Sequence, residues 1–173
     1  MIFLFDLDQT LINSVSAKKY RDNKNWKKVY ELIYDGSICE YDGINECLKM
    51  INILGHKIGI VTSAPETYTK RIIEKFKWSI NCTVCYHDTK NKKPHPEPIF
   101  SALKKLNCYD YDKKNIFFLG DSAIDIKTAK NAGVVSVACL WGSENKDEII
   151  NEKPDFILRE VKEIYEKFLK TNY

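Results

Sequence analysis

The sequence predicts a three-layer α/β/α sandwich built on a mostly parallel sheet, and two observations lead to this prediction. Short apolar runs of strand length alternate with longer amphipathic stretches along the chain. The apolar runs are nearly continuous rather than alternating, as is expected of parallel strands that are buried on both faces. Repeated strand–helix–strand units then place helices on both sides of the sheet.

The individual elements follow from local patterns. Five runs rich in β-branched and aromatic residues are the predicted strands: 2–5, 58–61, 83–86, 116–119 and 134–138. Apolar residues at helical spacing predict amphipathic helices within 99–106 and 161–168. Pro65 suits the first turn of a helix that follows Ser63, and Gly133 suits the end of a helix over about 122–132.

Residues 13–40 interrupt this alternation. They contain no strand-like run, and their pattern predicts one or two helices between Tyr20 and Tyr34. We therefore expect a helical insertion directly after the first strand of an otherwise regular domain.

Length and composition predict one globular domain over residues 1–173. The chain is 44% hydrophobic and 29% charged, and its net charge of +3 comes from 27 basic and 24 acidic residues. This charge is too small to indicate nucleic acid or a membrane surface as a partner. The apolar start at 1–5 runs into Asp6 without a basic leader, so the default expectation is a cytoplasmic protein with no membrane anchor and with reduced cysteines.

One pair of cysteines admits two interpretations. Cys82 and Cys85, with His87 nearby, have the spacing of half a zinc site. No second pair stands at a matching spacing, which favours a strand that carries two small apolar side chains.

Polar side chains follow three of the predicted strands at the point where each strand ends. Asp6 and Asp8 follow the first, Thr62 and Ser63 the second, and Asp121 the fourth. Ligands bind outside the carboxyl ends of the strands in open parallel sheets, so these groups are expected to share one crevice. Two further residues could reach the same crevice: Lys93, in the loop before the fourth strand, and Asp125.

The chemistry of such a crevice indicates a metal ion and phosphate. Four carboxylates, from Asp6, Asp8, Asp121 and Asp125, would repel one another unless a cation neutralised them. Ligands that are all oxygen favour Mg²⁺ over zinc. A lysine, a hydroxyl and free backbone N–H groups would supply donors for a multiply charged anion, and phosphate fits that description best.

At these residues the chain resembles the haloacid dehalogenase-like superfamily, and within it the phosphoglycolate-phosphatase-like branch. Four segments match the motifs of that superfamily in order: Asp6 to Leu11, Val61 to Ser63, Lys93 to Pro98, and Gly120 to Asp125. The resemblance covers nearly the whole chain except 13–40. It implies a Rossmann-like sheet and a Mg²⁺-dependent phosphatase that forms an aspartyl-phosphate.

The resemblance also implies a role for each matching residue. Asp6 would attack phosphorus, and Asp8 would protonate the leaving oxygen and then activate water. The resemblance assigns phosphate oxygens to Thr62, Ser63 and Lys93, and it assigns the metal to Asp6, Asp121 and the backbone carbonyl of Asp8, with Asp125 as a further ligand or a support behind the ligands.

The substrate stays open. In the related branch a helical cap of about twice the length of 13–40 closes over small substrates, so the resemblance implies a truncated cap. A small phosphorylated metabolite is the leading expectation. The alternatives are a phosphoprotein or nucleic-acid end, a mutase, and a non-catalytic phosphate-binding module. Basic residues between 18 and 28 either attract phosphorylated substrates or form a solvated helix face. The sequence does not indicate an oligomeric state.

Overall fold

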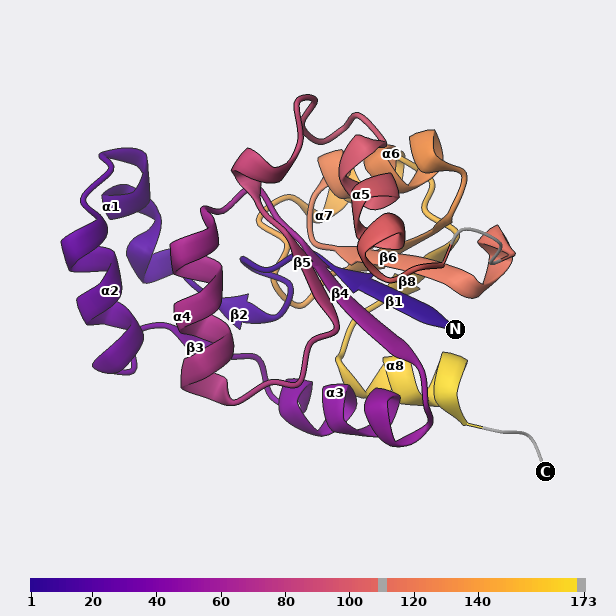
Figure 1. Cartoon of the computed structure of the whole chain (residues 1–173), viewed down its shortest axis with the longest axis horizontal. Coiled ribbons are helices and arrows are strands. Elements are labelled where there is room, and N and C mark those ends of the chain that lie inside the picture. Colours follow the sequence, from indigo (N-terminus) through magenta and orange to yellow (C-terminus); the bar gives the residue numbers. More distant parts are fainter. Residues whose placement is uncertain (109–111, 171–173) are drawn as a thin grey trace.

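A computed structural model describes residues 1–108 and 112–170 and contains a six-stranded parallel sheet with helices on both faces (Figure 1). The strand order is β5-β4-β1-β6-β7-β8. The strands are β1 (Ile2–Phe5), β4 (Lys57–Val61), β5 (Cys82–Val84), β6 (Ile116–Gly120), β7 (Val135–Cys139) and β8 (Phe156–Leu158). The predicted α/β/α sandwich is confirmed, and β1, which leads to Asp6, lies between β4 and β6.

Two helical layers cover the sheet because its strands present apolar side chains to both faces. One layer packs on side chains such as Phe3 and Phe5, and the other packs on Leu4 and Phe118. The first layer contains α3 (Ile44–Ile53), α4 (Glu66–Phe76) and α8 (Lys162–Ile164), which continues as a π-helical turn (Tyr165–Leu169). The second contains α5 (Glu97–Lys105), α6 (Ala123–Ala132) and α7 (Lys146–Asn151).

The insertion forms two helices beyond the carboxyl end of β1. These are α1 (Lys18–Asp22) and α2 (Trp26–Tyr34), at the left of Figure 1. The amphipathic α2 buries Val29, Leu32 and Ile33 against the first-layer core, and the predicted helices of the insertion are confirmed.

Three details of the prediction were wrong. The sheet has six strands rather than five, because β8 pairs in parallel with β7. The insertion is not free of strand, since β2 (Ile12–Asn13) and β3 (Cys39–Glu40) form an antiparallel pair at its base. Finally, two residues of the predicted apolar helix faces are exposed: Phe100, from the pattern over 99–106, is 46% exposed, and Tyr165, from the pattern over 161–168, is 43% exposed.

Cys82 and Cys85 are both buried, Cys82 within β5 and Cys85 directly after it. All six cysteines are free thiols. Burial raises the pKa of the Cys82 thiol to about 11, as expected of a thiol packed among apolar side chains. Within 1–108 and 112–170, no helix has the length and apolar character needed to cross a bilayer.

Candidate active site

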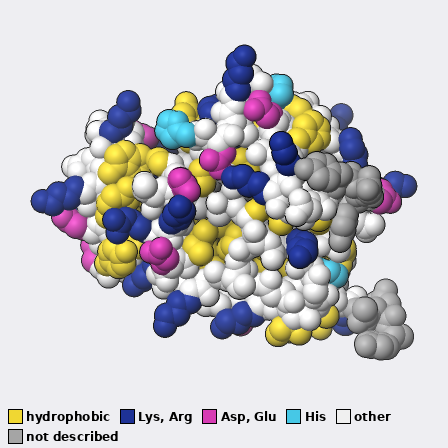
Figure 2. Space-filling model, in the orientation of Figure 1, with side chains coloured by type: hydrophobic (Ala, Val, Ile, Leu, Met, Phe, Trp, Pro, Cys, Tyr) yellow, Lys and Arg dark blue, Asp and Glu magenta, His cyan; other side chains and the backbone are white. Residues whose placement is uncertain are grey.

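The side chains that were predicted to converge do so at the carboxyl ends of β1, β4 and β6. Together with the insertion they line a cleft of about 800 Å³. On the face shown in Figure 2, acidic and basic side chains are interspersed around the boundary between the insertion and the sheet. The predicted site residues that line the cleft are Asp6, Asp8, Thr62, Ser63, Lys93, Asp121 and Asp125.

Lys93 is the cation that joins two of the acids. Its Nζ lies 2.7 Å from Oδ1 of Asp6 and 2.7 Å from Oδ1 of Asp125, and its side chain is only 7% exposed. Burial alone would lower the pKa of Lys93, but the two carboxylates outweigh this effect and raise it above its usual value. Lys93 is therefore a fixed positive charge between the acids.

Three carboxylates form a compact group that could hold a metal ion. One oxygen from each of Asp6, Asp121 and Asp125 lies within 4.8 Å of the others. Burial and the neighbouring acids raise the pKa of Asp6 to about 7, although Lys93 opposes the shift. Burial and the charges of Asp6 and Asp125 raise the pKa of Asp121 to about 8. The positive charge of Lys93 thus does not fully neutralise the negative charge of the three carboxylates. A divalent cation with a preference for oxygen ligands fits this group.

Asp125 has the most contacts of the three acids. Its Oδ2 accepts hydrogen bonds from the Ser122 backbone N–H (3.2 Å) and hydroxyl (2.5 Å). Its Oδ1 accepts a hydrogen bond from Nζ of Lys93. Asp125 lies in the first turn of α6, and a Cβ on Gly120 would lie 2.3 Å from the Cβ of Asp125. The Gly120 position therefore admits no side chain without moving Asp125. These contacts make Asp125 a support for Lys93 as well as a candidate ligand.

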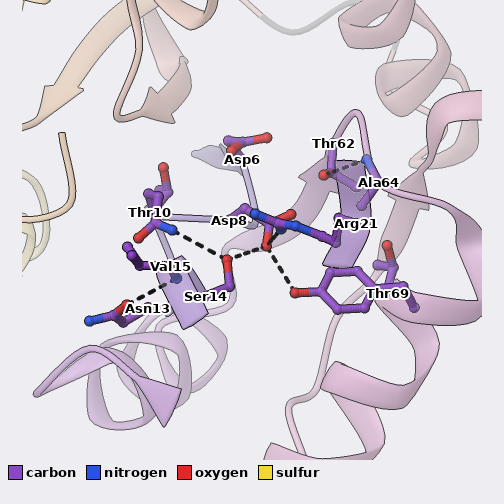
Figure 3. A network of polar contacts seen from close by, with 12 residues as sticks. Asp6, Asp8, Thr10, Asn13, Ser14, Val15, Arg21, Thr62, Ala64 and Thr69 are labelled. Carbon is purple, nitrogen blue, oxygen red and sulfur yellow. Dashed lines mark hydrogen bonds and ion pairs between the residues drawn. The ribbon is translucent and has the colours of Figure 1, made fainter. Parts of the chain in front are cut away.

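Asp8 lies outside the three-carboxylate group. Its Oδ1 accepts hydrogen bonds from the hydroxyls of Ser14 (2.5 Å) and Tyr68 (2.9 Å), and it pairs with the guanidinium of Arg21 (Figure 3). The Asp8 side chain is therefore not part of the candidate metal group, and its contacts come from a different set of residues.

The loop that carries Asp8 is held by hydrogen bonds to the two residues that follow Asp8, Gln9 and Thr10. Gln9 has a φ of 63°, and its side-chain amide donates to Ser14 (3.3 Å) and accepts from the Tyr41 hydroxyl (3.0 Å). The Trp141 indole donates to the Thr10 carbonyl (2.9 Å), and the Thr10 hydroxyl donates to Oδ1 of Asp121 (2.9 Å). These bonds set the position of Asp8 relative to Asp121.

On the second strand end, Thr62 and Ser63 differ in environment. Thr62 is buried, and its Oγ1 accepts a hydrogen bond from the Ala64 backbone N–H (3.1 Å), which leaves the hydroxyl hydrogen available to a ligand. Ser63 is exposed at the wall of the cleft. The arrangement offers donors for an oxyanion opposite the acids.

Sequence reasoning missed the side chains around Asp8. Ser14 and Tyr68 are buried, and a hydroxyl beside a catalytic-type carboxylate has no sequence signature at these spacings. In the sequence, Arg21 is one of several basic residues between 18 and 28, and nothing there distinguishes it from the others. Of that stretch, Lys18, Arg21 and Lys24 line the cleft, whereas Lys28 pairs with Glu31 on the outside of α2.

Comparisons with known proteins bear on the family and the fold of this chain. The family model of the haloacid dehalogenase-like hydrolases matches residues 14–139. Curated relatives include pyrophosphatase PpaX of Bacillus pumilus, 29% identical over 136 residues, which are 76% of this chain and 60% of that protein. Phosphoglycolate phosphatase of Xylella fastidiosa is 30% identical over 121 residues, 69% of this chain and 52% of that protein. The chain thus spans about 52–60% of the length of these two relatives.

Solved structures share the fold. CbbY from Rhodobacter sphaeroides, in complex with phosphate, has a TM-score of 0.79 at 15% identity, with 94% of this chain and 95% of that chain covered. A HAD-superfamily hydrolase from Geobacter sulfurreducens has a TM-score of 0.74 at 17% identity and covers 95% of this chain and 97% of its own. The family model matches 14–139 and residues of all four motifs line one cleft, so the chain belongs to the haloacid dehalogenase-like hydrolase family.

Proposed function

We propose that this chain is a Mg²⁺-dependent phosphatase that hydrolyses small phosphorylated substrates through an aspartyl-phosphate on Asp6. One observation carries the proposal: Asp6 directly follows the central strand β1, contacts the buried Lys93, and has two further carboxylates within 4.8 Å. The pyrophosphatase and the phosphoglycolate phosphatase among its relatives both cleave a bond to phosphorus, which supports the same class of reaction here.

In the proposed reaction the substrate phosphoryl group lies between Asp6 and the donors of Thr62 and Lys93. A carboxylate oxygen of Asp6 forms a bond to phosphorus while the bond to the leaving oxygen breaks, and Asp8 donates its proton to that oxygen. Asp8 then accepts a proton from water as the water oxygen attacks the phosphorus, which releases phosphate and restores Asp6. Ser63 is assigned to the same phosphate oxygens as Thr62.

Asp6, Asp121 and the backbone carbonyl of Asp8 would hold the Mg²⁺, with Asp125 orienting Lys93. When bound, the ion supplies positive charge that lets a carboxylate approach an anionic phosphate. In the same proposal residues 13–40 form a short cap over the site, and the whole chain acts as one catalytic domain.

The metal proposal predicts a pH-dependent stability. Unfolded carboxyls ionise near pH 3.8, but folded Asp6 and Asp121 without metal keep protons up to about pH 7 and about pH 8. The folded state therefore binds more protons than the unfolded state in this interval, and the free energy of unfolding contributed by these two groups falls as the pH rises through it. Mg²⁺ replaces the protons, so its stabilising effect is expected to be larger at high pH.

Thermal melts test this expectation directly. At about one hundred times its Kd, Mg²⁺ should raise Tm by roughly 5–10 °C at pH 8, and by clearly less at pH 5. Asp121→Asn should lose most of this increase. An equal Tm shift at both pH values, or an unchanged shift in Asp121→Asn, would contradict the assignment.

The activity itself is tested with p-nitrophenyl phosphate and a panel of small phosphate esters, with Mg²⁺ and with excess chelator. We expect turnover with Mg²⁺ and its loss with chelator. Phosphopeptides and end-phosphorylated oligonucleotides form the comparison arm, because the 800 Å³ cleft has the size typical of small-ligand sites. Turnover confined to the macromolecules would contradict the proposed substrate class. Absence of turnover on every substrate would contradict the proposal that the chain is a phosphatase.

A further inference from the structure

Arg21 brings a positive charge from the insertion to the lining of the cleft. It lies in α1, its side chain is 18% exposed, and its guanidinium pairs with Oδ1 of Asp8 (Figure 3). The guanidinium also lies 5.9 Å from the centre of the buried Tyr68 ring. Its position is therefore fixed by contacts from two other parts of the chain.

The contacts of Asp8 do not by themselves require Arg21. Oδ1 of Asp8 already accepts hydrogen bonds from the hydroxyls of Ser14 and Tyr68. A guanidinium carries five N–H donors in a planar fork. The ion pair with Asp8 is made by the terminal nitrogen Nη1, and the Tyr68 hydroxyl is a further hydrogen-bond partner of the guanidinium. These two partners do not use all five donors. Arg21 can thus contact Asp8 and bind a second oxyanion at the same time.

The charges of the cleft are divided between its two walls. The wall at the strand ends carries the acids and Lys93, which would hold the transferred phosphoryl group. The wall formed by the insertion carries three cations, Lys18, Arg21 and Lys24, and one exposed carboxylate, Asp22. Lys18 is engaged by Glu144 at 2.6 Å, whereas Arg21 is the cation of this wall that touches a residue of the proposed reaction.

The position of Arg21 indicates which part of the substrate it would contact. This step rests on the proposed function, in which Asp8 protonates the leaving oxygen. The leaving group must then lie against Asp8, and the side chain that contacts Asp8 from the insertion lies beside that group. A neutral leaving group would place no opposite charge there, whereas an anionic one could form a bidentate pair with the partly desolvated guanidinium.

We propose that Arg21 is a specificity-determining residue that binds a second oxyanion, a carboxylate or a second phosphate, on the leaving portion of the substrate. The chain should then prefer phosphate compounds whose leaving group is itself charged. The preference should therefore appear when two substrates of similar size are compared, one with a charged and one with a neutral leaving group. It should depend on the planar guanidinium of Arg21 and not only on a positive charge at that position.

A matched pair of substrates tests the proposal. Phosphoglycolate carries a carboxylate where 2-hydroxyethyl phosphate carries a neutral hydroxymethyl group, and pyrophosphate distinguishes a second phosphate from a carboxylate. We expect wild type to favour phosphoglycolate or pyrophosphate over 2-hydroxyethyl phosphate in kcat/KM by about tenfold to a hundredfold. Arg21→Gln should reduce this ratio towards one, and Arg21→Lys should leave an intermediate ratio.

Lys28→Gln is the matched control, because it removes the same charge from the insertion but Lys28 pairs with Glu31 outside the cleft. It should leave the ratio unchanged. If Arg21→Gln lowers kcat/KM for every substrate by the same factor, Arg21 only positions Asp8 and the specificity proposal is overturned. An unchanged ratio in both Arg21 variants has the same consequence. Absence of turnover by wild type on all three substrates would instead remove the proposed phosphatase function, and the role of Arg21 with it.

Discussion

Replacing Asp6 by Asn is expected to lower kcat on p-nitrophenyl phosphate by at least about 10⁴-fold while the protein stays folded. The amide has nearly the shape of the carboxylate but cannot form an acyl phosphate. Lys93 keeps its 2.7 Å contact with Asp125, so the variant does not leave this buried cation without an acidic partner.

The fold of the Asp6→Asn variant can be checked at the same time. Because burial raises the pKa of Asp6 to about 7, the neutral amide removes an unfavourable buried charge, and the metal-free variant should melt no lower than wild type at pH 8. Asp22→Asn, which removes an exposed carboxylate at the rim of the same cleft, should keep its turnover. Turnover by Asp6→Asn within tenfold of wild type would remove Asp6 as the nucleophile.

Replacing Lys93 by Met is expected to damage both stability and turnover. The substitution keeps an unbranched side chain of similar length but leaves Asp6 and Asp125 without the cation that lies 2.7 Å from each. Loss of one partner from a buried ion pair typically costs about 3–5 kcal/mol of unfolding free energy, and loss of a donor to the transferred group costs about 10²–10³-fold in kcat.

Urea denaturation and steady-state kinetics measure the two effects of Lys93→Met separately. Lys90→Met, at an exposed position in the same loop, is the control and should change neither. Since Mg²⁺ also neutralises the acids, adding it should recover part of the lost stability of Lys93→Met but not its turnover. Wild-type stability without metal would show that Lys93 does not hold these carboxylates together.

The strand ends explain why much of the site could be predicted. Ile2–Phe5 and Ile116–Gly120 are continuous apolar runs, so their burial in a parallel sheet, and the meeting of Asp6 with Asp121 at one edge, follow from period and topology. The sequence pattern does not encode the detailed contacts at that edge. The shared contact of Lys93 with Asp6 and Asp125 depends on how a loop between β5 and α5 folds back.

The parts that escaped prediction depend on short elements and long-range contacts. The three residues of β8 are too few for a periodic signal. The charged neighbours Asp155 and Arg159 are typical of a surface loop rather than of a buried strand. The pair of β2 and β3 joins two residues from each end of the insertion. Arg21 and Tyr68 meet Asp8 from α1 and α4, and no local pattern connects positions so far apart.

The most direct test of the central claim is to trap the covalent intermediate. The enzyme is mixed with excess phosphorylated substrate and Mg²⁺, quenched, and treated with borohydride, which reduces an acyl phosphate to an alcohol, and the peptides are then analysed by mass spectrometry. We predict homoserine at position 6 in the wild-type protein, and unmodified residues at the positions of Asp8, Asp121 and Asp125. Reduction at one of those three aspartates, or an unmodified Asp6 under conditions of full turnover, would contradict the account.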